Sequence, residues 1–238
     1  MFETNTSSGG SVQASRRIWL VRHGLTEWNA RQRFCGQSDV PLTQEGRQQA
    51  QWLAHYLRSA PIVALYSSDL SRAHETAEFI AQSRKQALTM QLQASWRELD
   101  FGLWDGLTYA EIADRYPARL NFFTHPEDHA PPGGEALHQL RQRVQAAFLA
   151  IMEYCSSLEA GDILIVSHGG PLRVLLTSLL AMPPERQWQL ALNPGSLSAL
   201  DLVPAQNFAD LRATLALLNM QQTHTDIAAS ASSWDGEE

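Results

Sequence analysis

The chain has 238 residues, of which 44% are hydrophobic and 18% are charged, so it can bury a substantial core. Its formal net charge is −7. An acidic chain without a basic patch is a poor partner for nucleic acid or for an anionic membrane surface. Since no apolar run approaches the roughly 18 residues that cross a bilayer, no membrane span is predicted.

The chain contains only two cysteines, Cys35 and Cys155, which are far apart and lack the spacing of metal ligands. This pattern predicts neither a disulfide framework nor a metal centre, and it favours a reducing cytoplasm. Residues 1–15 are rich in Ser, Gly, Thr and Gln and have no apolar stretch typical of a signal peptide. We expect them to form a disordered tail, followed by one domain over 16–220 and a polar, acidic tail over 221–238.

The pattern of apolar residues predicts alternating strands and helices. Ile18–Val21 is an unbroken apolar run that predicts a buried strand, and Thr43 is placed to cap a helix that ends near Arg58. Further strands are predicted at 62–68, 88–92, 162–166, 197–203 and 211–218, and further helices from Leu70, at 107–116, at 135–159 and at 171–180. Residues 96–106 read as an ordered loop and 125–134 as a surface loop or lid. We therefore expect a three-layer α/β/α sandwich with a largely parallel sheet.

Two histidines follow buried strands directly, and each precedes a glycine. His23 comes after Ile18–Val21, and His168 comes after Asp162–Val166. Ligand sites in open α/β sheets form at the carboxyl ends of the strands, so these imidazoles are expected to face each other there. Taken singly, such a histidine is more often structural. Two of them, each beside glycines that let a ligand approach the backbone, indicate a functional site.

Several segments resemble the histidine phosphatase superfamily, also called phosphoglycerate-mutase-like. They occur in the family order: Val21–Asn29 (VRHGLTEWN), Gly36–Gly46 (GQSDVPLTQEG), Ser67–Glu78 (SSDLSRAHETAE), Arg97–Gly106 (RELDFGLWDG), Pro131–Val144 (PPGGEALHQLRQRV) and Val166–Gly170 (VSHGG). The resemblance covers residues 17–203. It implies a phosphatase that needs no metal or other cofactor and acts on a small phosphate ester; it leaves a homodimer open.

The resemblance assigns His23 as a nucleophile that becomes phosphorylated, and an imidazole is partly neutral at pH 7 without an activating base. It assigns Arg22 and Arg72 as the phosphate clamp, since a guanidinium fork matches phosphate oxygens. His168 is implied as a second imidazole that donates to a phosphoryl oxygen when protonated. The remaining phosphate or substrate contacts that it implies are Asn29, Cys35, Gly36, Gln37 and Gly169, the last at a helix N-terminus that favours an anion.

The resemblance also implies an acid in the RELDFG block, because an alkoxide is a poor leaving group. Glu98 is the predicted general acid and base, with Asp100 as its competitor. Phe101, Leu103, Trp104 and Tyr109 are expected either to line an apolar pocket or to form the core beneath the loop.

Phosphoglycerate mutases of this superfamily carry a longer, more basic insertion after the acid, whereas Glu98 is followed by a compact apolar stretch whose first basic residue is Arg115. The sequence therefore favours the phosphatase branch, which includes α-ribazole phosphatase and broad-specificity members. α-Ribazole 5′-phosphate, another small metabolite phosphate or a broad range of esters remain open as substrates. A phosphoglycerate mutase is the alternative enzyme, and an inactive phospho-ligand binding module is an alternative of another class.

Overall fold

The computed structural model describes residues 15–158, 160–203, 205 and 207–222. The two predicted tails lie almost wholly outside these residues, so they and the domain limits remain predictions. Within the described part of the chain, no helix combines the length and the apolar character needed to cross a membrane.

Six strands form one mixed sheet in the order β3-β2-β4-β1-β5-β6. The strands are β1 (Arg16–Arg22), β2 (Ile62–Ser67), β3 (Met90–Leu92), β4 (Asp162–Ser167), β5 (Leu197–Val203) and β6 (Arg212–Met220). The pairs β1–β4, β2–β4 and β2–β3 are parallel, whereas β5 runs antiparallel to both β1 and β6. The predicted parallel arrangement therefore holds from β3 to β1, and the last two strands turn back.

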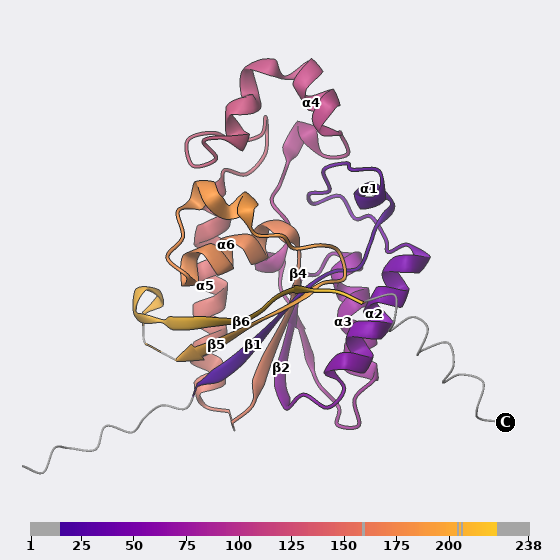
Figure 1. Ribbon diagram of the computed structural model, residues 1–238, viewed down its shortest axis with the longest axis vertical. Coiled ribbons are helices and arrows are strands. Elements are labelled where there is room, and N and C mark those ends of the chain that lie inside the picture. The colour runs from indigo at the N-terminus through magenta and orange to yellow at the C-terminus, as the bar shows by residue number, and fades with distance from the viewer. Residues whose placement is uncertain (1–14, 159, 204, 206, 223–238) are drawn as a thin grey trace, which may run out of the picture.

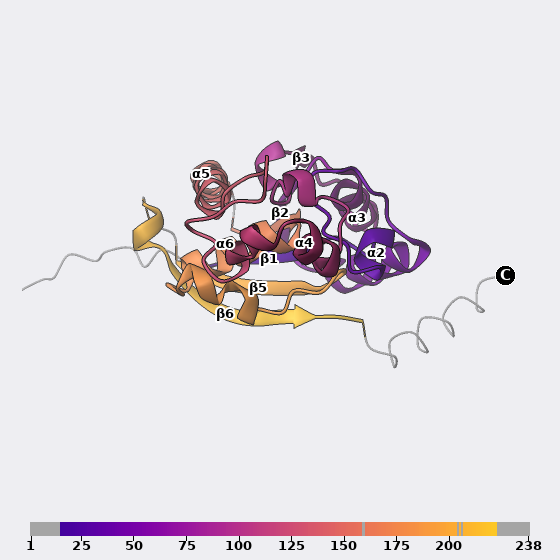
Figure 2. The same cartoon turned by 90° about the horizontal axis from the view of Figure 1, so that it is seen from above.

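Helices cover both faces of this sheet (Figures 1 and 2). The helices are α1 (Glu27–Ala30), α2 (Gln44–Leu57), α3 (Ser71–Gln82), α4 (Tyr109–Arg115), α5 (Leu137–Ser156) and α6 (Gly169–Leu179). α5 and α6 lie on one face, and α2 and α3 lie on the other. The predicted three-layer α/β/α architecture is confirmed.

The position of β1 inside the sheet explains its unbroken apolar sequence. Ile18 and Leu20 pack into the core under α5 and α6, whereas Trp19 and Val21 pack into the core under α2 and α3. Successive side chains of a strand point to opposite faces, so a strand covered on both faces needs apolar residues at every position. The apolar run stops at the carboxyl end of β1, where the chain becomes polar.

The segment from α4 through the 3₁₀ helix η3 (Pro117–Phe123) and the loop 125–134 projects from the sheet beyond the carboxyl ends of its parallel strands (Figure 1). We call residues 109–134 the cap. Thr108 begins it with a capping box, because its side chain accepts from the N–H of Glu111 while the Glu111 carboxylate accepts from the N–H of Thr108. Phe123 stacks on the fully buried Trp104, with ring centroids 5.5 Å apart, so the cap rests on the loop 96–106.

Candidate active site

His23 lies directly after β1 and is 2% exposed. Its Nδ1 is 2.7 Å from the carbonyl oxygen of Gly24. A carbonyl oxygen can only accept, so Nδ1 carries the proton and Nε2 of the neutral ring keeps its lone pair. Burial, together with the charges of Arg72 and Arg22, lowers the pKa of His23 well below its usual value. The imidazole is therefore neutral and has a free ring nitrogen at neutral pH.

His168 follows β4 as the N-cap of α6, and its ring centroid is 5.0 Å from that of His23. Its Nε2 is 2.8 Å from the hydroxyl oxygen of Ser68, which already accepts from the N–H of Leu70. A hydroxyl has one proton and two lone pairs, so Ser68 either donates to Nε2 or accepts from it; donation would place the proton of a neutral ring on Nδ1. Burial and the neighbouring cations Arg72 and Arg22 lower the pKa of His168 well below its usual value. A neutral ring with its proton on Nδ1 is also a donor, and the expected donation from His168 to a phosphoryl oxygen stays a prediction.

Arg72 and Arg22 enter the site from α3 and from the end of β1. Arg72 is fully buried and donates to the carbonyl oxygens of Gly36 at 2.6 Å and Ser38 at 2.9 Å. Arg22 donates to the carbonyl oxygen of Leu192 at 2.6 Å. Burial lowers the pKa of Arg22 to about 10, so this guanidinium group remains charged at neutral pH. Backbone carbonyl oxygens therefore accept hydrogen bonds from Nη atoms of both guanidinium groups.

Three buried nitrogen atoms at this site have no hydrogen-bond partner in the described structure. They are Nε of Arg22, Nε of Arg72 and Nδ1 of His168. Buried polar atoms without partners cost free energy, so such a group needs an explanation. A tetrahedral anion with several acceptor oxygens would satisfy all three beside the free Nε2 of His23, and the donor set suits a phosphoryl group.

Glu98 is 7% exposed and is held by backbone amides. Its Oε1 accepts from the N–H of Leu99 at 2.8 Å and from that of Gly170 at 3.0 Å. Asp100, the competing acid, accepts instead from the N–H of Gly102 within the loop. Glu98 also lines the cavity described next, whereas Asp100 does not. Geometry therefore favours Glu98 for proton transfer.

A cavity of about 180 Å³ opens beneath the cap. Of the predicted site residues, it is lined by Arg22, Asn29, Cys35, Glu98 and Gly169. His23, Arg72 and His168 are buried beside this cavity and do not line it.

Gly169 begins α6, where the absence of a side chain matters. A Cβ at this position would lie 2.9 Å from Nη1 of Arg173 and 3.5 Å from Cζ of Arg22. The two guanidinium groups thus pack directly on the backbone at the helix N-terminus. Asn29 lines the same cavity, and its Oδ1 accepts from the hydroxyl of Thr26 at 2.9 Å, which leaves its amide nitrogen to face an anion.

The three consecutive residues Cys35, Gly36 and Gln37 have different environments. Burial raises the pKa of the Cys35 thiol to about 11, so it is a neutral wall group. Gly36 is buried and supports Arg72 through its carbonyl, while its N–H donates to Asp105 at 2.7 Å. Gln37 does not line the cavity and makes no described contact with the site residues.

The aromatic pocket expected after Glu98 is only partly present. Phe101 lines the cavity, but Trp104 is fully buried in the core, and Leu103 and Tyr109 are 62% and 53% exposed. The apolar wall comes instead from residues distant in sequence, such as Trp188.

Several polar residues of the site were not predicted, among them Arg33, Ser68, Arg173 and Gln187. The Ser68 hydroxyl oxygen lies 2.8 Å from Nε2 of His168, and Arg173 lines the cavity beside Glu98. Arg173 lies one helical turn after Gly169. Its position in the first helical turn after the SHGG motif is the sequence signal that could have identified it as a site residue. In the described part of the chain, no cluster of three or more His, Cys, Asp or Glu side chains is arranged to hold a metal ion.

The model of the histidine phosphatase superfamily (branch 1) matches residues 18–213. The chain belongs to this superfamily. It is also 36% identical over 191 residues to the probable phosphoglycerate mutase GpmB of Salmonella typhi. This alignment covers 80% of the present chain and 86% of GpmB.

Solved structures of phosphatases share the fold. A putative α-ribazole-5′-phosphate phosphatase from Escherichia coli is 29% identical, with a TM-score of 0.75 over 87% of this chain and 97% of that one. A mycobacterial glucosyl-3-phosphoglycerate phosphatase is also 29% identical, with a TM-score of 0.77 over 87% of this chain and all of that one. Membership of the superfamily and these neighbours indicate phosphatase activity on small phosphate esters.

Proposed function

We propose that this protein is a phosphomonoesterase that hydrolyses small-metabolite phosphate esters through a phosphohistidine on His23, without a metal ion. One observation carries the proposal. The Nδ1–H of His23 donates to Gly24, which leaves Nε2 free beside the unpartnered Nε atoms of Arg22 and Arg72. A neutral nucleophilic nitrogen next to two fixed cations suits attack on an anionic phosphoryl group.

In the first step, Nε2 of His23 attacks phosphorus while the bond from phosphorus to the ester oxygen breaks. The protonated carboxyl group of Glu98 gives its proton to that oxygen, so the product leaves as an alcohol. In the second step, the Glu98 carboxylate takes a proton from water as the water oxygen attacks the phosphohistidine. Inorganic phosphate leaves and His23 is regenerated. Arg22 and Arg72 balance the charge of the phosphoryl group throughout.

The hydrogen bonds from backbone amides to the Glu98 carboxyl group support the proposed role of Glu98 as general acid and base. The N–H groups of Leu99 and Gly170 fix the carboxyl group at the wall of the cavity, where an ester oxygen would lie. A proton donor must be within hydrogen-bond reach of the atom that it protonates, and a fixed carboxyl group meets that requirement without reorganisation.

The substrate that we propose is α-ribazole 5′-phosphate or a broader range of metabolite esters, by analogy with the phosphatase neighbours. The alternative is a phosphoglycerate mutase, which the GpmB relative favours. An inactive binding module is disfavoured because the nucleophile, the clamp and the acid are all present. We also retain a cytoplasmic location, supported by the two free cysteines, and a homodimer as expectations.

The decisive test measures phosphate release from p-nitrophenyl phosphate and a panel of metabolite phosphates in EDTA. We expect activity in the wild type and none in His23→Ala, with a phosphorylated enzyme trapped by rapid quenching only in the wild type. His55→Ala, which changes an exposed histidine of α2, is the matched control. Activity that needs added metal, or that persists in His23→Ala, would contradict the mechanism. Conversion of 3-phosphoglycerate to 2-phosphoglycerate in preference to hydrolysis would establish the mutase.

A further inference from the structure

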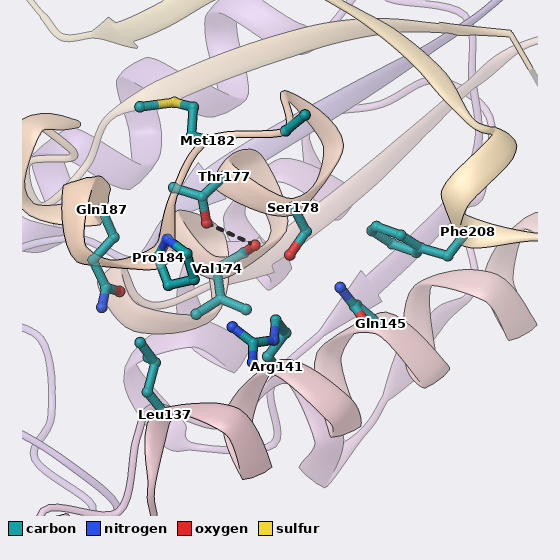
Figure 3. Close-up of a pocket in the computed structure, with 11 residues that line it drawn as sticks. Leu137, Arg141, Gln145, Val174, Thr177, Ser178, Met182, Pro184, Gln187 and Phe208 are labelled. Carbon is teal, nitrogen blue, oxygen red and sulfur yellow. Dashed lines mark hydrogen bonds between the residues drawn. The ribbon is translucent and has the colours of Figure 1, made fainter. Parts of the chain in front are cut away.

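A second cavity of about 220 Å³ lies between α5, α6 and the 3₁₀ helix η4 (Pro184–Gln189), as Figure 3 shows. Leu137 and Gln187 line both this cavity and the one that contains Glu98. The two cavities are therefore neighbours separated by a shared wall. We call the cavity that contains Glu98 the phosphate cavity, and the cavity between α5, α6 and η4 the side cavity.

The volumes of the two cavities indicate that they act together. Sites for small molecules typically enclose about 300–1,000 Å³. Neither cavity reaches that range alone, but their combined volume does. A phosphate ester whose alcohol is larger than a few atoms would extend beyond the phosphate cavity, and the space behind Leu137 and Gln187 adjoins it.

The side chain of Gln187, in the shared wall, indicates independently that a ligand binds at this wall. This residue is 1% exposed, and its Nε2 has no hydrogen-bond partner in the described structure. A buried amide without a partner destabilises the free protein, whereas a ligand acceptor would satisfy it. Because the terminal torsion of a glutamine is broad, its N–H can turn towards a group that passes the wall.

The lining of the side cavity defines the chemistry of its occupant. Val174, Met182 and Phe208 supply apolar surface. Arg141, the one charged side chain in this lining, is neutralised by Glu127, whose two carboxylate oxygens accept from it at 2.7 and 2.6 Å.

The polar groups of the side cavity are few. The hydroxyl of Thr177 donates to the carbonyl oxygen of Val174, as the dashed line in Figure 3 shows, so it is already satisfied. Gln145 and Ser178 add polar groups without charge. A neutral, partly apolar group with an acceptor atom matches this lining better than an anion does.

We propose that the side cavity is a subsite for the alcohol part of the substrate, and that it takes an uncharged ring group carrying an oxygen or nitrogen acceptor. Gln187 would donate to that acceptor, and Leu137 would pack on the ring as it passes from the phosphate cavity. The inference rests on the proposed phosphatase function and narrows its substrate class.

The test compares kcat/KM for ethyl phosphate with kcat/KM for uridine 5′-monophosphate, measured as phosphate release. Both are esters of primary alcohols, so their chemical steps are similar, but only the second has uncharged rings with acceptor atoms. We expect the wild type to prefer uridine 5′-monophosphate. Gln145→Trp fills the side cavity and should reduce that preference by about tenfold, because the apolar contacts are lost.

Gln142→Trp is the matched control, since it places the same side chain on an exposed face of α5 outside both cavities. It should leave the preference unchanged. Gln187→Met removes the amide without changing the length of the side chain. It should lower the ratio of kcat/KM for uridine 5′-monophosphate to kcat/KM for ethyl phosphate about two- to tenfold. The same variant should melt at a higher temperature than the wild type, because it removes an unpartnered buried amide.

The outcomes separate the two proposals. Phosphate release from neither ester, nor from the wider panel, would overturn the phosphatase function itself. Hydrolysis in which Gln145→Trp changes both esters equally, or neither, would overturn the subsite and leave the phosphatase function standing.

Discussion

Glu98 receives the N–H of Gly170 through both carboxylate oxygens, at 3.0 and 3.2 Å. A Cβ added to Gly170 would overlap Oε1 of Glu98. Gly170, the second glycine of the SHGG motif, thus leaves the space that the carboxyl group of the proposed acid occupies. Gly169, the first glycine, lets two guanidinium groups reach the helix N-terminus. One motif after β4 thereby positions both the proposed proton donor and the proposed anion site.

Gly170→Ala should displace Glu98 and lower kcat by about 100-fold, in the lower part of the range for loss of general acid catalysis. The measurement is phosphate release at saturating substrate, with circular dichroism to verify folding. The same substitution should have no further effect in a Glu98→Ala background, because both changes remove the same group. Additive losses would show that Gly170 acts otherwise.

Arg72→Lys should weaken the binding of inorganic phosphate by about 10- to 100-fold, because an ammonium group keeps the charge but loses the fork. The measurement is the rise in melting temperature with phosphate concentration. Arg84→Lys is the control, since Arg84 also donates to two carbonyl oxygens, of Leu57 and Ala60, away from the site. Equal phosphate affinity in both variants would contradict the role of Arg72.

The two buried histidines should make stability depend on pH. Their pKa values are lowered in the folded protein, whereas in the unfolded chain they take up protons near pH 6.5. Below that pH the unfolded state binds more protons, so the free energy of unfolding falls as the pH drops towards the folded pKa values.

Urea unfolding between pH 7.5 and 5.5 measures this slope. His168→Asn should reduce it by up to about 1.4 kcal/mol per pH unit, which corresponds to one proton. His55→Asn, on an exposed face of α2, is the control and should reduce the slope less. Identical slopes in the wild type and His168→Asn would contradict the neutral state assigned to His168.

Cys35 should be unreactive, although it lines the phosphate cavity. Its pKa of about 11 leaves almost no thiolate at pH 7.5. We expect no alkylation by iodoacetamide in the native protein, as read by mass spectrometry, and activity of Cys35→Ser within about threefold of the wild type. Rapid alkylation with loss of activity would indicate a reactive thiol instead.

The sequence predicted the positions of those candidate site residues that follow directly from strand ends. His23, His168 and Arg72 come shortly after apolar runs, and parallel strands bring their carboxyl ends to one edge of the sheet. The direction of β5 was not predictable in this way, because a short apolar run fits a parallel or an antiparallel neighbour equally well. The mixed sheet therefore emerged only from the structure.

Contacts between distant segments were also beyond a reading of local patterns. Ser68 meets His168 across 100 positions of sequence, and Gln187 reaches the cavity from a 3₁₀ helix that has no apolar periodicity. The apolar character of Leu103 predicts a place in a pocket or in the core beneath the loop, yet it lies on the surface. Side-chain direction in an irregular loop depends on backbone angles that apolar patterns do not encode.

The central position of β1 has a consequence for motion. It is bonded on both sides, to β4 and β5, and the two cores enclose it, whereas the cap adjoins the sheet only at one edge. Local unfolding starts where few buried contacts must be broken, so the strand that carries His23 belongs to the part of the fold that opens last. The alignment of the proposed nucleophile is thereby coupled to the stability of the whole sheet, so local fluctuations of the surface loops leave it in place.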